Sequence, residues 1–210
     1  MLTLYSVPHS LYCAKTRILL RAKGLVWEER APEGGAASPS YRARFPFGNL
    51  PGLLDGDFAL EDSEAIAEYI EETHPTPPML PQGAEARARM RERGRFHDTR
   101  LEPALRRLFP QVATPDAATL PPLRDDLNLR LAQLGRLVND HPLPFGLGDC
   151  GYAPTFLWID LLDRELGWGI HWPAPVQAYR ATLEALPPVA EELHAYRPHA
   201  QGWIAGKRGR

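Results

Sequence analysis

Residues 49–63 read NLPGLLDGDFALEDS, and this stretch decides the fold. Its apolar segments Leu53-Leu54 and Phe58-Ala59-Leu60 flank Asp55-Gly56, a dipeptide typical of tight hairpin turns. Asp62-Ser63 then begins an amphipathic helix, because helix N-termini favour side chains that accept hydrogen bonds from free N–H groups. The stretch therefore predicts two short antiparallel strands that lead directly into a capped helix.

Pro51 stands immediately before the first of these strands, and we expect a cis Leu50–Pro51 peptide bond there. X-Pro bonds prefer the trans form only slightly, so a turn can hold the cis form. Such a turn leaves the N–H and C=O of Leu50 free to bind an extended peptide. The helix N-terminus at Asp62-Ser63 offers free N–H groups and a positive dipole end, which attract a carboxylate. Together these features predict a site for a small anionic peptide.

The first thirty residues predict the rest of the same sheet. Leu2–Tyr5 and Val26–Glu29 are short strand-like segments, and the segment from Leu11 to Lys23 between them is helical in pattern. Gly24 is a natural stop for that helix. With a short helix around Tyr41, the order is βαβ-α-ββα, which predicts a mixed four-stranded sheet with helices on both faces.

The remainder of the chain is predicted to be helical. Residues 1–74 form the predicted α/β domain, and residues 75–83 form a proline-rich linker that excludes helix and sheet. Residues 84–210 form an all-α domain. Its predicted helices cover 84–109 (bent or split at Pro103), 123–139, 149–166, 176–186 and 188–196. The basic end of the chain from Lys207 is expected to be frayed.

Composition excludes several classes of protein. The chain has 210 residues, 44% of them apolar, which is enough for one or two compact cores. Its formal net charge of −2 gives no electrostatic reason to expect nucleic acid. No apolar run approaches the roughly 18 residues of a membrane span, and the first residues do not resemble a secretion signal. Two distant cysteines predict no disulfide framework, and seven histidines show no metal-site spacing. We expect a soluble, cytoplasmic protein.

Four segments carry a resemblance to a known family. They are YSVPHSLYCAKTR at 5–17, NLP at 49–51, EDSEAI at 61–66 and DCGYAPT at 149–155. Each is weakly specific alone, but together and in this order they resemble the glutathione transferases of the cytosolic, bacterial-like type. The resemblance covers most of the chain. It implies a thioredoxin-like N-terminal domain that binds glutathione, an all-α C-terminal domain and a homodimer.

The resemblance also implies the chemistry, in which the glutathione thiol is activated to attack a small hydrophobic electrophile. Glutathione would be a co-substrate, with no cofactor or metal. A free thiol has a pKa of about 8.5, and lowering it by about two units takes roughly 2.7 kcal/mol. Ser10, just before the first helix, is the candidate that stabilises the thiolate by donating a hydrogen bond. Cys13, placed like the second cysteine of a redox motif, and Tyr5, at the end of the first strand, are its rivals.

The glutathione-binding residues follow from the same resemblance. Leu50, beside Pro51, would pair its main chain with the cysteinyl unit. The hydroxyl and N–H of Ser63 would bind the γ-glutamyl carboxylate, and Asp62 would bind the γ-glutamyl amine. Asn49 stands where many members carry lysine, so the glycine carboxylate would receive a neutral hydrogen bond from Asn49 or a charge from Arg42 or Arg44.

Three further expectations concern stability, assembly and alternatives. Asp149 is assigned to helix capping and folding, although Gly146 stands where the family has a hydroxyl partner. The homodimer is supported by apolar residues expected to be exposed, Phe58 and Met79. A catalytically silent binding or scaffold protein, and a thiol oxidoreductase that uses Cys13, remain alternative functions.

Overall fold

The computed structural model of the chain describes residues 1–209, and its N-terminal part is built on one mixed sheet. The strands are β1 (Leu2–Tyr5), β2 (Trp27–Arg30), β3 (Gly52–Asp55) and β4 (Phe58–Glu61), in the order β2-β1-β3-β4. β1 pairs in parallel with β2 and antiparallel with β3, which forms a hairpin with β4. This is the predicted mixed four-stranded sheet.

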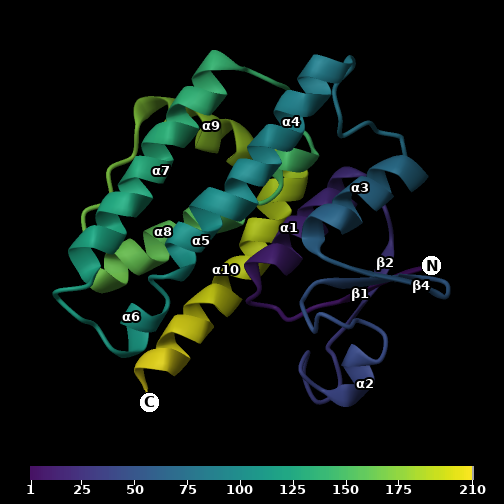
Figure 1. Cartoon of the computed structure of the whole chain (residues 1–210), viewed down its shortest axis with the longest axis horizontal. Coiled ribbons are helices and arrows are strands. Elements are labelled where there is room, and N and C mark those ends of the chain that lie inside the picture. The colour runs from purple at the N-terminus through teal and green to yellow at the C-terminus, as the bar shows by residue number, and fades with distance from the viewer. Residues whose placement is uncertain (210) are drawn as a thin grey trace.

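Helices cover both faces of this sheet, as the sequence predicts (Figure 1). α1 (Leu11–Ala22) and α3 (Ser63–Thr73) contact each other, and their apolar sides bury Ile18 and Ile66. α2 (Pro39–Arg42) is the short helix expected around Tyr41, whose side chain packs closely on Gly52 of β3. A Cβ at Gly52 would lie 2.5 Å from the Tyr41 hydroxyl, so only glycine fits at this contact.

The second part of the chain is helical and packs around α8 (Tyr152–Leu166), whose buried residues include Phe156, Trp158 and Ile159. Its helices are α4 (Ala84–Phe96), the π-helix η1 (His97–Leu101), α5 (Glu102–Arg106), α6 (Pro110–Ala113), α7 (Leu120–Asp140), the 3₁₀ helix η2 (Leu147–Asp149), α8 (Tyr152–Leu166), α9 (Ala174–Glu184) and α10 (Pro187–Arg208). The predicted fold class, a thioredoxin-like domain followed by an all-α domain, is confirmed. α1 joins the two parts because it contacts both α8 and α10 (Figure 1). Among residues 1–209 no helix is both long enough and apolar enough to cross a membrane.

The helix predicted over residues 84–109 is split near Pro103, one of the two expected alternatives, and the interruption is the π-helix η1, which ends two residues before Pro103. Pro103 has no N–H to donate to the carbonyl of Thr99, so regular α-helical bonding cannot pass through this point. α10 continues through Pro198 to Arg208, well beyond the end predicted at Tyr196.

The basic end of the chain is ordered as helix rather than frayed as far as residue 208. Arg208 Nη2 donates to the carbonyl of Glu165 at 3.0 Å, and Arg208 Nε lies 2.7 Å from the Glu165 carboxylate. Arg210, which belonged to the predicted frayed segment, lies outside the described residues. Met79 was expected to be exposed, but it is buried. Phe58 is 49% exposed, as expected.

The linker between α3 and α4 is fixed to the N-terminal domain by one buried ion pair, Lys23 with Glu71. The Lys23 ammonium also donates to two linker carbonyls, each at 2.8 Å, and the Glu71 carboxylate accepts from two linker N–H groups. These main-chain partners are His74 and Pro77 for Lys23, and Met79 and Leu80 for Glu71. The proline-rich segment thus has a defined path, which sets how α4 begins beside α3.

Candidate functional site

A cavity of about 380 Å³ lies where the N-terminal domain meets α4 and η1. It is lined by Tyr12, Asn49, Leu50, Asp62, Ser63, Arg95, Asp98 and Thr99. The structure therefore brings together four residues that the sequence placed in one binding site: Asn49, Leu50, Asp62 and Ser63. Pro51 is buried behind them.

The loop before β3 presents the main chain of Leu50 to this cavity. The Leu50–Pro51 bond is cis, as predicted. Within residues 1–209 neither the N–H nor the C=O of Leu50 has a hydrogen-bond partner. The loop is held from behind, since Glu61 accepts from the N–H groups of Phe47 and Asn49 and the Tyr41 hydroxyl donates to the Asn49 carbonyl at 2.8 Å. A fixed loop with a free main-chain donor and acceptor suits an extended peptide ligand.

Asp62 and Ser63 have different roles at the N-terminus of α3: Asp62 caps the helix, and Ser63 stays free to bind a ligand. Asp62 Oδ1 accepts from the N–H groups of Glu64 and Ala65, at 2.9 and 3.0 Å, and so caps the helix. In the described chain Asp62 is the one non-glycine residue with positive φ, at 79°, a strained conformation of the kind found at functional sites. Ser63 is 8% exposed, and within residues 1–209 its hydroxyl and N–H have no partner. The cap thus leaves a free hydroxyl and N–H facing a cavity at the positive end of the helix.

A buried ionic cluster lies directly behind this helix start. The Lys15 ammonium is 2.7 Å from both the Glu64 and the Asp98 carboxylates, so it links α1, α3 and η1. Asp98 also contacts His97 Nδ1 at 2.7 Å, and His97 Nε2 lies 2.7 Å from the Thr155 hydroxyl. Burial alone would raise the pKa of the Asp98 carboxyl, but the hydrogen bond from His97 and the charge of Lys15 outweigh it and hold that pKa well below 3.8.

This pKa predicts how acid affects stability. A carboxyl whose pKa is lowered by folding stabilises the protein above its unfolded pKa, and that contribution is lost as the pH falls towards the folded pKa. We therefore expect Asp98→Asn to be less stable than the parent at neutral pH but to lose less stability below about pH 4. Urea unfolding at several pH values measures this. Lys15→Met should likewise reduce the fall of the free energy of unfolding below about pH 4. Parallel curves for the parent and Asp98→Asn would contradict the assignment.

Ser10 does not line the cavity but lies two residues before Tyr12, which does. It is the N-cap of α1, and its Oγ accepts from the N–H of Cys13 at 3.3 Å. The loop that carries it is anchored by the helical domain, because the Tyr196 hydroxyl donates to the carbonyl of His9 at 2.8 Å. Tyr196 in turn accepts from Trp158 Nε1 at 2.6 Å. The position of Ser10 therefore depends on α8 and α10 as well as on α1.

The two rivals of Ser10 lie away from the cavity. Cys13 is fully buried, and burial raises the pKa of its thiol above the ordinary value, so it is unsuited to be an exposed nucleophile. Tyr5 packs edge-on against Tyr41 and Phe45, with ring centroids 5.7 and 5.4 Å apart. These rings and Arg44 line a separate cavity of about 370 Å³.

Sequence reasoning missed half of the cavity wall: Tyr12, Arg95, Asp98 and Thr99. Tyr12 donates to the Glu102 carboxylate at 3.1 Å, and burial followed by the charge of Glu102 raises the pKa of its phenol. The sequence shows that His97 and Asp98 are neighbours, but which way their side chains face depends on the π-helix η1, which the sequence does not predict. Only the helical spacing of Arg95 and Asp98 signalled that they share a face.

Within residues 1–209 no cluster of histidine, cysteine and acidic side chains is arranged to hold a metal ion.

Asp149 has the contacts of a residue that stabilises the fold. It is 1% exposed, accepts from the N–H of Gly146 at 2.8 Å and from Arg93 Nη1 at 2.9 Å, and also bonds the Tyr179 hydroxyl. A Cβ at Gly146 would lie 2.6 Å from the backbone carbonyl oxygen of Met79, so a serine or threonine does not fit there without a shift of the main chain. The capping box is therefore incomplete, and the Asp149 carboxylate bonds Arg93 and Tyr179 in addition to the N–H of Gly146.

The fold and the cavity define a class: a thioredoxin-like domain with a cis-proline loop and a helix N-terminus that face a ligand cavity, joined to an all-α domain. Residues 4–78 match the family model described as glutathione S-transferase, N-terminal domain. Among curated proteins, the chain is 30% identical over 179 residues to a stringent starvation protein A homolog of Coxiella burnetii, covering 82% of this chain and 80% of that protein. It is 28% identical over 176 residues to glutathione S-transferase 1 of Dianthus caryophyllus, covering 80% and 79%.

Solved structures give the same result. A delta-class glutathione transferase of Nilaparvata lugens superposes with a TM-score of 0.82 at 19% identity, over 99% of this chain and 98% of that one. A glutathione S-transferase of Methylobacterium radiotolerans, solved in complex with glutathione sulfonate, has a TM-score of 0.73 at 26% identity, over 91% and 93%. The chain belongs to the glutathione S-transferase family.

Proposed function

We propose that this protein is a glutathione transferase that activates the glutathione thiol for attack on a small electrophile. The observation that carries the proposal is the unpartnered main chain of Leu50 beside the unpartnered hydroxyl and N–H of Ser63, in one cavity. An extended peptide with a carboxylate at one end satisfies both groups. The relative from Methylobacterium radiotolerans, whose structure holds glutathione sulfonate, supports glutathione as that peptide.

The proposed mechanism follows from this placement. The γ-glutamyl carboxylate binds Ser63, its amine binds the second carboxylate oxygen of Asp62, and the cysteinyl unit pairs with Leu50. This orientation directs the sulfur towards the N-terminus of α1, where Ser10 donates to the thiolate. The thiolate then attacks an electrophilic carbon, a C–S bond forms, the leaving group departs with the bonding electrons, and the thiol proton goes to solvent. For the glycine carboxylate, Asn49 offers a neutral hydrogen bond.

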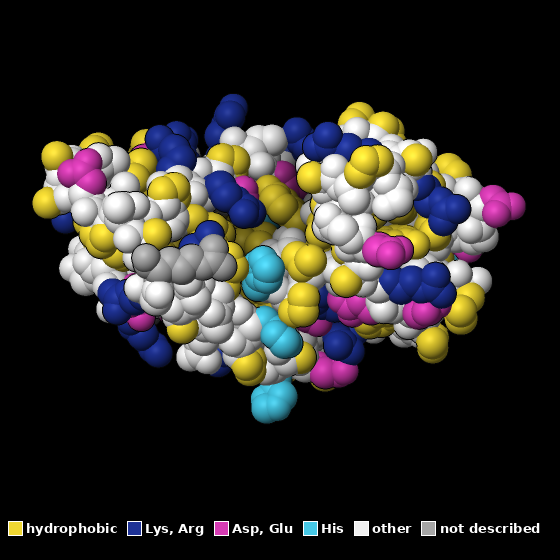
Figure 2. All heavy atoms as spheres, turned by 90° about the horizontal axis from the view of Figure 1, so that it is seen from below, with side chains coloured by type: hydrophobic (Ala, Val, Ile, Leu, Met, Phe, Trp, Pro, Cys, Tyr) yellow, Lys and Arg dark blue, Asp and Glu magenta, His cyan; other side chains and the backbone are white. Residues whose placement is uncertain are grey.

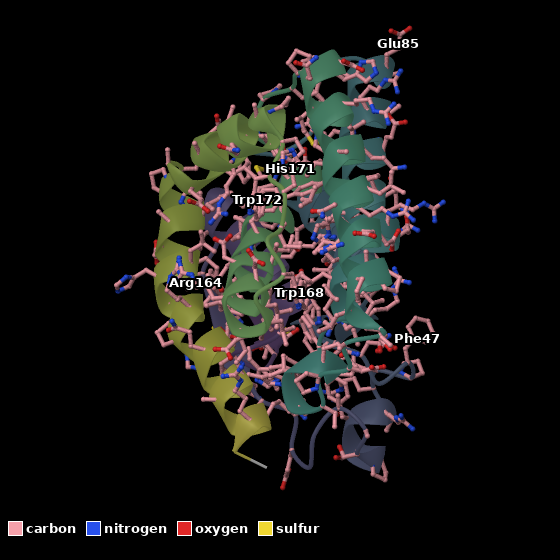
Figure 3. All side chains as sticks on the ribbon, turned by 90° about the vertical axis from the view of Figure 1, so that its left-hand side faces the viewer. Phe47, Glu85, Arg164, Trp168, His171 and Trp172 are labelled. Carbon is pink, nitrogen blue, oxygen red and sulfur yellow. The ribbon has the colours of Figure 1, made fainter. Side chains whose placement is uncertain are left out.

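We place the activity in the cytoplasm and assign it to a homodimer. Cys13 and Cys150 are both free thiols, as is usual in a reducing compartment. Two large apolar side chains near the cavity loop and hairpin are exposed: Phe47 at 69%, which points outwards in Figure 3, and Phe58 at 49%. Exposed apolar groups of this kind favour a partner surface. Sedimentation at micromolar concentration tests this, and a mass of one chain would contradict the dimer.

A binding protein without chemistry is the second candidate function. Relatives named stringent starvation protein A homolog favour it, as does the position of Ser10 outside the cavity wall. A thiol oxidoreductase is disfavoured by the complete burial of Cys13. Detoxification by conjugation and ligand binding without turnover both require the same glutathione site, so binding is tested first.

We expect Ser63→Ala to weaken glutathione binding by about 1 to 3 kcal/mol, the usual cost of leaving a buried polar group without its hydrogen-bond partner. Isothermal titration of the parent and the variant measures this. Ser40→Ala, an exposed serine of α2, is the control and should bind like the parent. If the parent itself shows no saturable binding, both the transferase and the glutathione-binding alternative fail.

A further inference from the structure

One face of α10 lies beside the loop that carries Ser10. Tyr196, His199, Trp203 and Lys207 are spaced three or four residues apart, so they share one side of the helix. Tyr196 bonds the carbonyl of His9. Figure 2 shows histidine side chains in a row that runs from the hollow between the two halves of the molecule to its lower edge, with lysine or arginine side chains nearby. This face therefore forms a wall next to the proposed position of the glutathione sulfur.

The wall is aromatic. The Trp203 ring lies 5.2 Å from Phe109 and 5.5 Å from Trp158, and the Phe109 and Trp158 rings are 4.8 Å apart. Trp158 is buried, whereas Trp203 and Phe109 are only half-buried. The Trp203 and Phe109 side chains thus keep some accessible surface, which suits contact with an aromatic ligand.

The wall is also positively charged. Lys207 Nζ lies 5.3 Å from the centre of the Trp203 ring, and Arg106 Cζ lies 4.9 Å from the centre of the Phe109 ring. Arg106 is paired with Glu102, but within residues 1–209 Lys207 has no acidic partner. Burial lowers the pKa of His9 most, and the charges of His199 and Lys207 lower it further, so the Lys207 ammonium acts on the residue next to Ser10.

The acidic groups around this loop each contact a cation other than Lys207. Glu102 binds Arg106 and Tyr12, while Glu29 and Glu192 both bind the buried Arg17. Among residues 1–209, the Lys207 ammonium is thus a cation of this wall that has no acidic partner and is available to an anionic ligand.

We infer that the preferred electrophile is an aromatic molecule that carries an anionic group, with its ring against Trp203 and Phe109 and its anion against the Lys207 ammonium. This inference rests on the proposed function, because it names the substrate class of the same site. A neutral aromatic molecule gains the ring contacts alone and leaves the ammonium unpaired. An anionic one gains an additional ion pair beside a half-buried ring, where solvent screening is reduced.

The test compares two aryl chlorides that react in the same way. The glutathione thiolate attacks the ring carbon, the C–S bond forms, chloride leaves with the bonding electrons, and the thiol proton goes to solvent. 1-Chloro-2,4-dinitrobenzene is neutral and 4-chloro-3,5-dinitrobenzoate is anionic. Each variant is compared with the parent on the same electrophile, so the intrinsic reactivities of the two electrophiles cancel.

We expect Lys207→Gln to lower kcat/KM for the benzoate about five-fold, the effect of one partly screened ion pair, and to leave the neutral substrate within about two-fold. Lys207→Glu should lower the benzoate value further. Arg208→Gln is the matched control, because Arg208 neighbours Lys207 in sequence but pairs with Glu165. An equal loss on both electrophiles, or no loss on the benzoate, overturns the inference.

Binding separates this inference from the proposed function. The anionic dye 8-anilinonaphthalene-1-sulfonate and the neutral dye N-phenyl-1-naphthylamine report on the wall without any turnover. If the parent conjugates neither electrophile and does not ionise bound glutathione, the transferase proposal fails. The dyes still decide the inference: selective loss of the sulfonate dye in Lys207→Gln supports it, and unchanged binding of both dyes overturns it.

Discussion

In the Ser10→Ala variant, the thiol of bound glutathione should titrate about one to two pH units higher than in the parent, while the affinity for glutathione stays nearly unchanged. The hydroxyl of Ser10 is the proposed side-chain donor at the N-terminus of α1, and a hydrogen bond to a charged group is worth about 1.5 to 3 kcal/mol. At a pH below both values, the thiolate fraction and therefore the turnover should fall about 10- to 100-fold. Thiolate absorbance against pH and the rate at neutral pH measure the two effects.

The control must separate activation of the thiol from capping of the helix. Ser38 is the N-cap of α2 and accepts from the N–H of Tyr41 at 3.3 Å, the same distance as the Ser10 bond to Cys13. Ser38→Ala should cost a similar cap energy, about 1 kcal/mol, without moving the thiol titration. If Ser10→Ala titrates like the parent, Ser10 is a cap only, and Cys13→Ser and Tyr5→Phe then test the rivals.

The parts of the fold that the sequence predicts are those determined by neighbouring residues. The turn Asp55-Gly56, the cap Asp62 and the cis bond at Pro51 each follow from chemistry within a few residues. For the same reason, Leu50 and Ser63, which local chemistry predicted to lie together, line one cavity, as does Asn49, which the family resemblance placed beside them. Their geometry belongs to a single hairpin and the helix after it.

The rest of the site depends on contacts that are distant in the sequence. Asp98 meets Lys15 across 83 residues, and Tyr196 meets His9 across 187. No local pattern specifies which side of the π-helix faces α1. The continuation of α10 past Pro198 is likewise not specified by the local sequence. Pro198 has no N–H to donate to the carbonyl of His194, but His194 is exposed, so water can replace the lost donor.

Asp149→Ala should lower the free energy of unfolding by about 3 to 5 kcal/mol, the usual cost of removing one partner from a buried ion pair. Arg93 has 3% of its side chain exposed, so the variant leaves its charge unpaired in the interior. The N-H of Gly146 and the hydroxyl of Tyr179 lose their acceptor as well. Urea unfolding followed by circular dichroism measures the loss.

Asp160→Ala is the matched control on α8, because Asp160 pairs with Arg180 but both side chains are more than one-fifth exposed. Exposed pairs contribute about 1 kcal/mol or less, so this variant should stay close to the parent. Adding Arg93→Met to Asp149→Ala should restore part of the lost stability, since the buried charge is then removed. Equal losses in Asp149→Ala and Asp160→Ala would mean that the buried charge is not the cause. A double variant no more stable than Asp149→Ala would instead assign the loss to the Gly146 and Tyr179 hydrogen bonds.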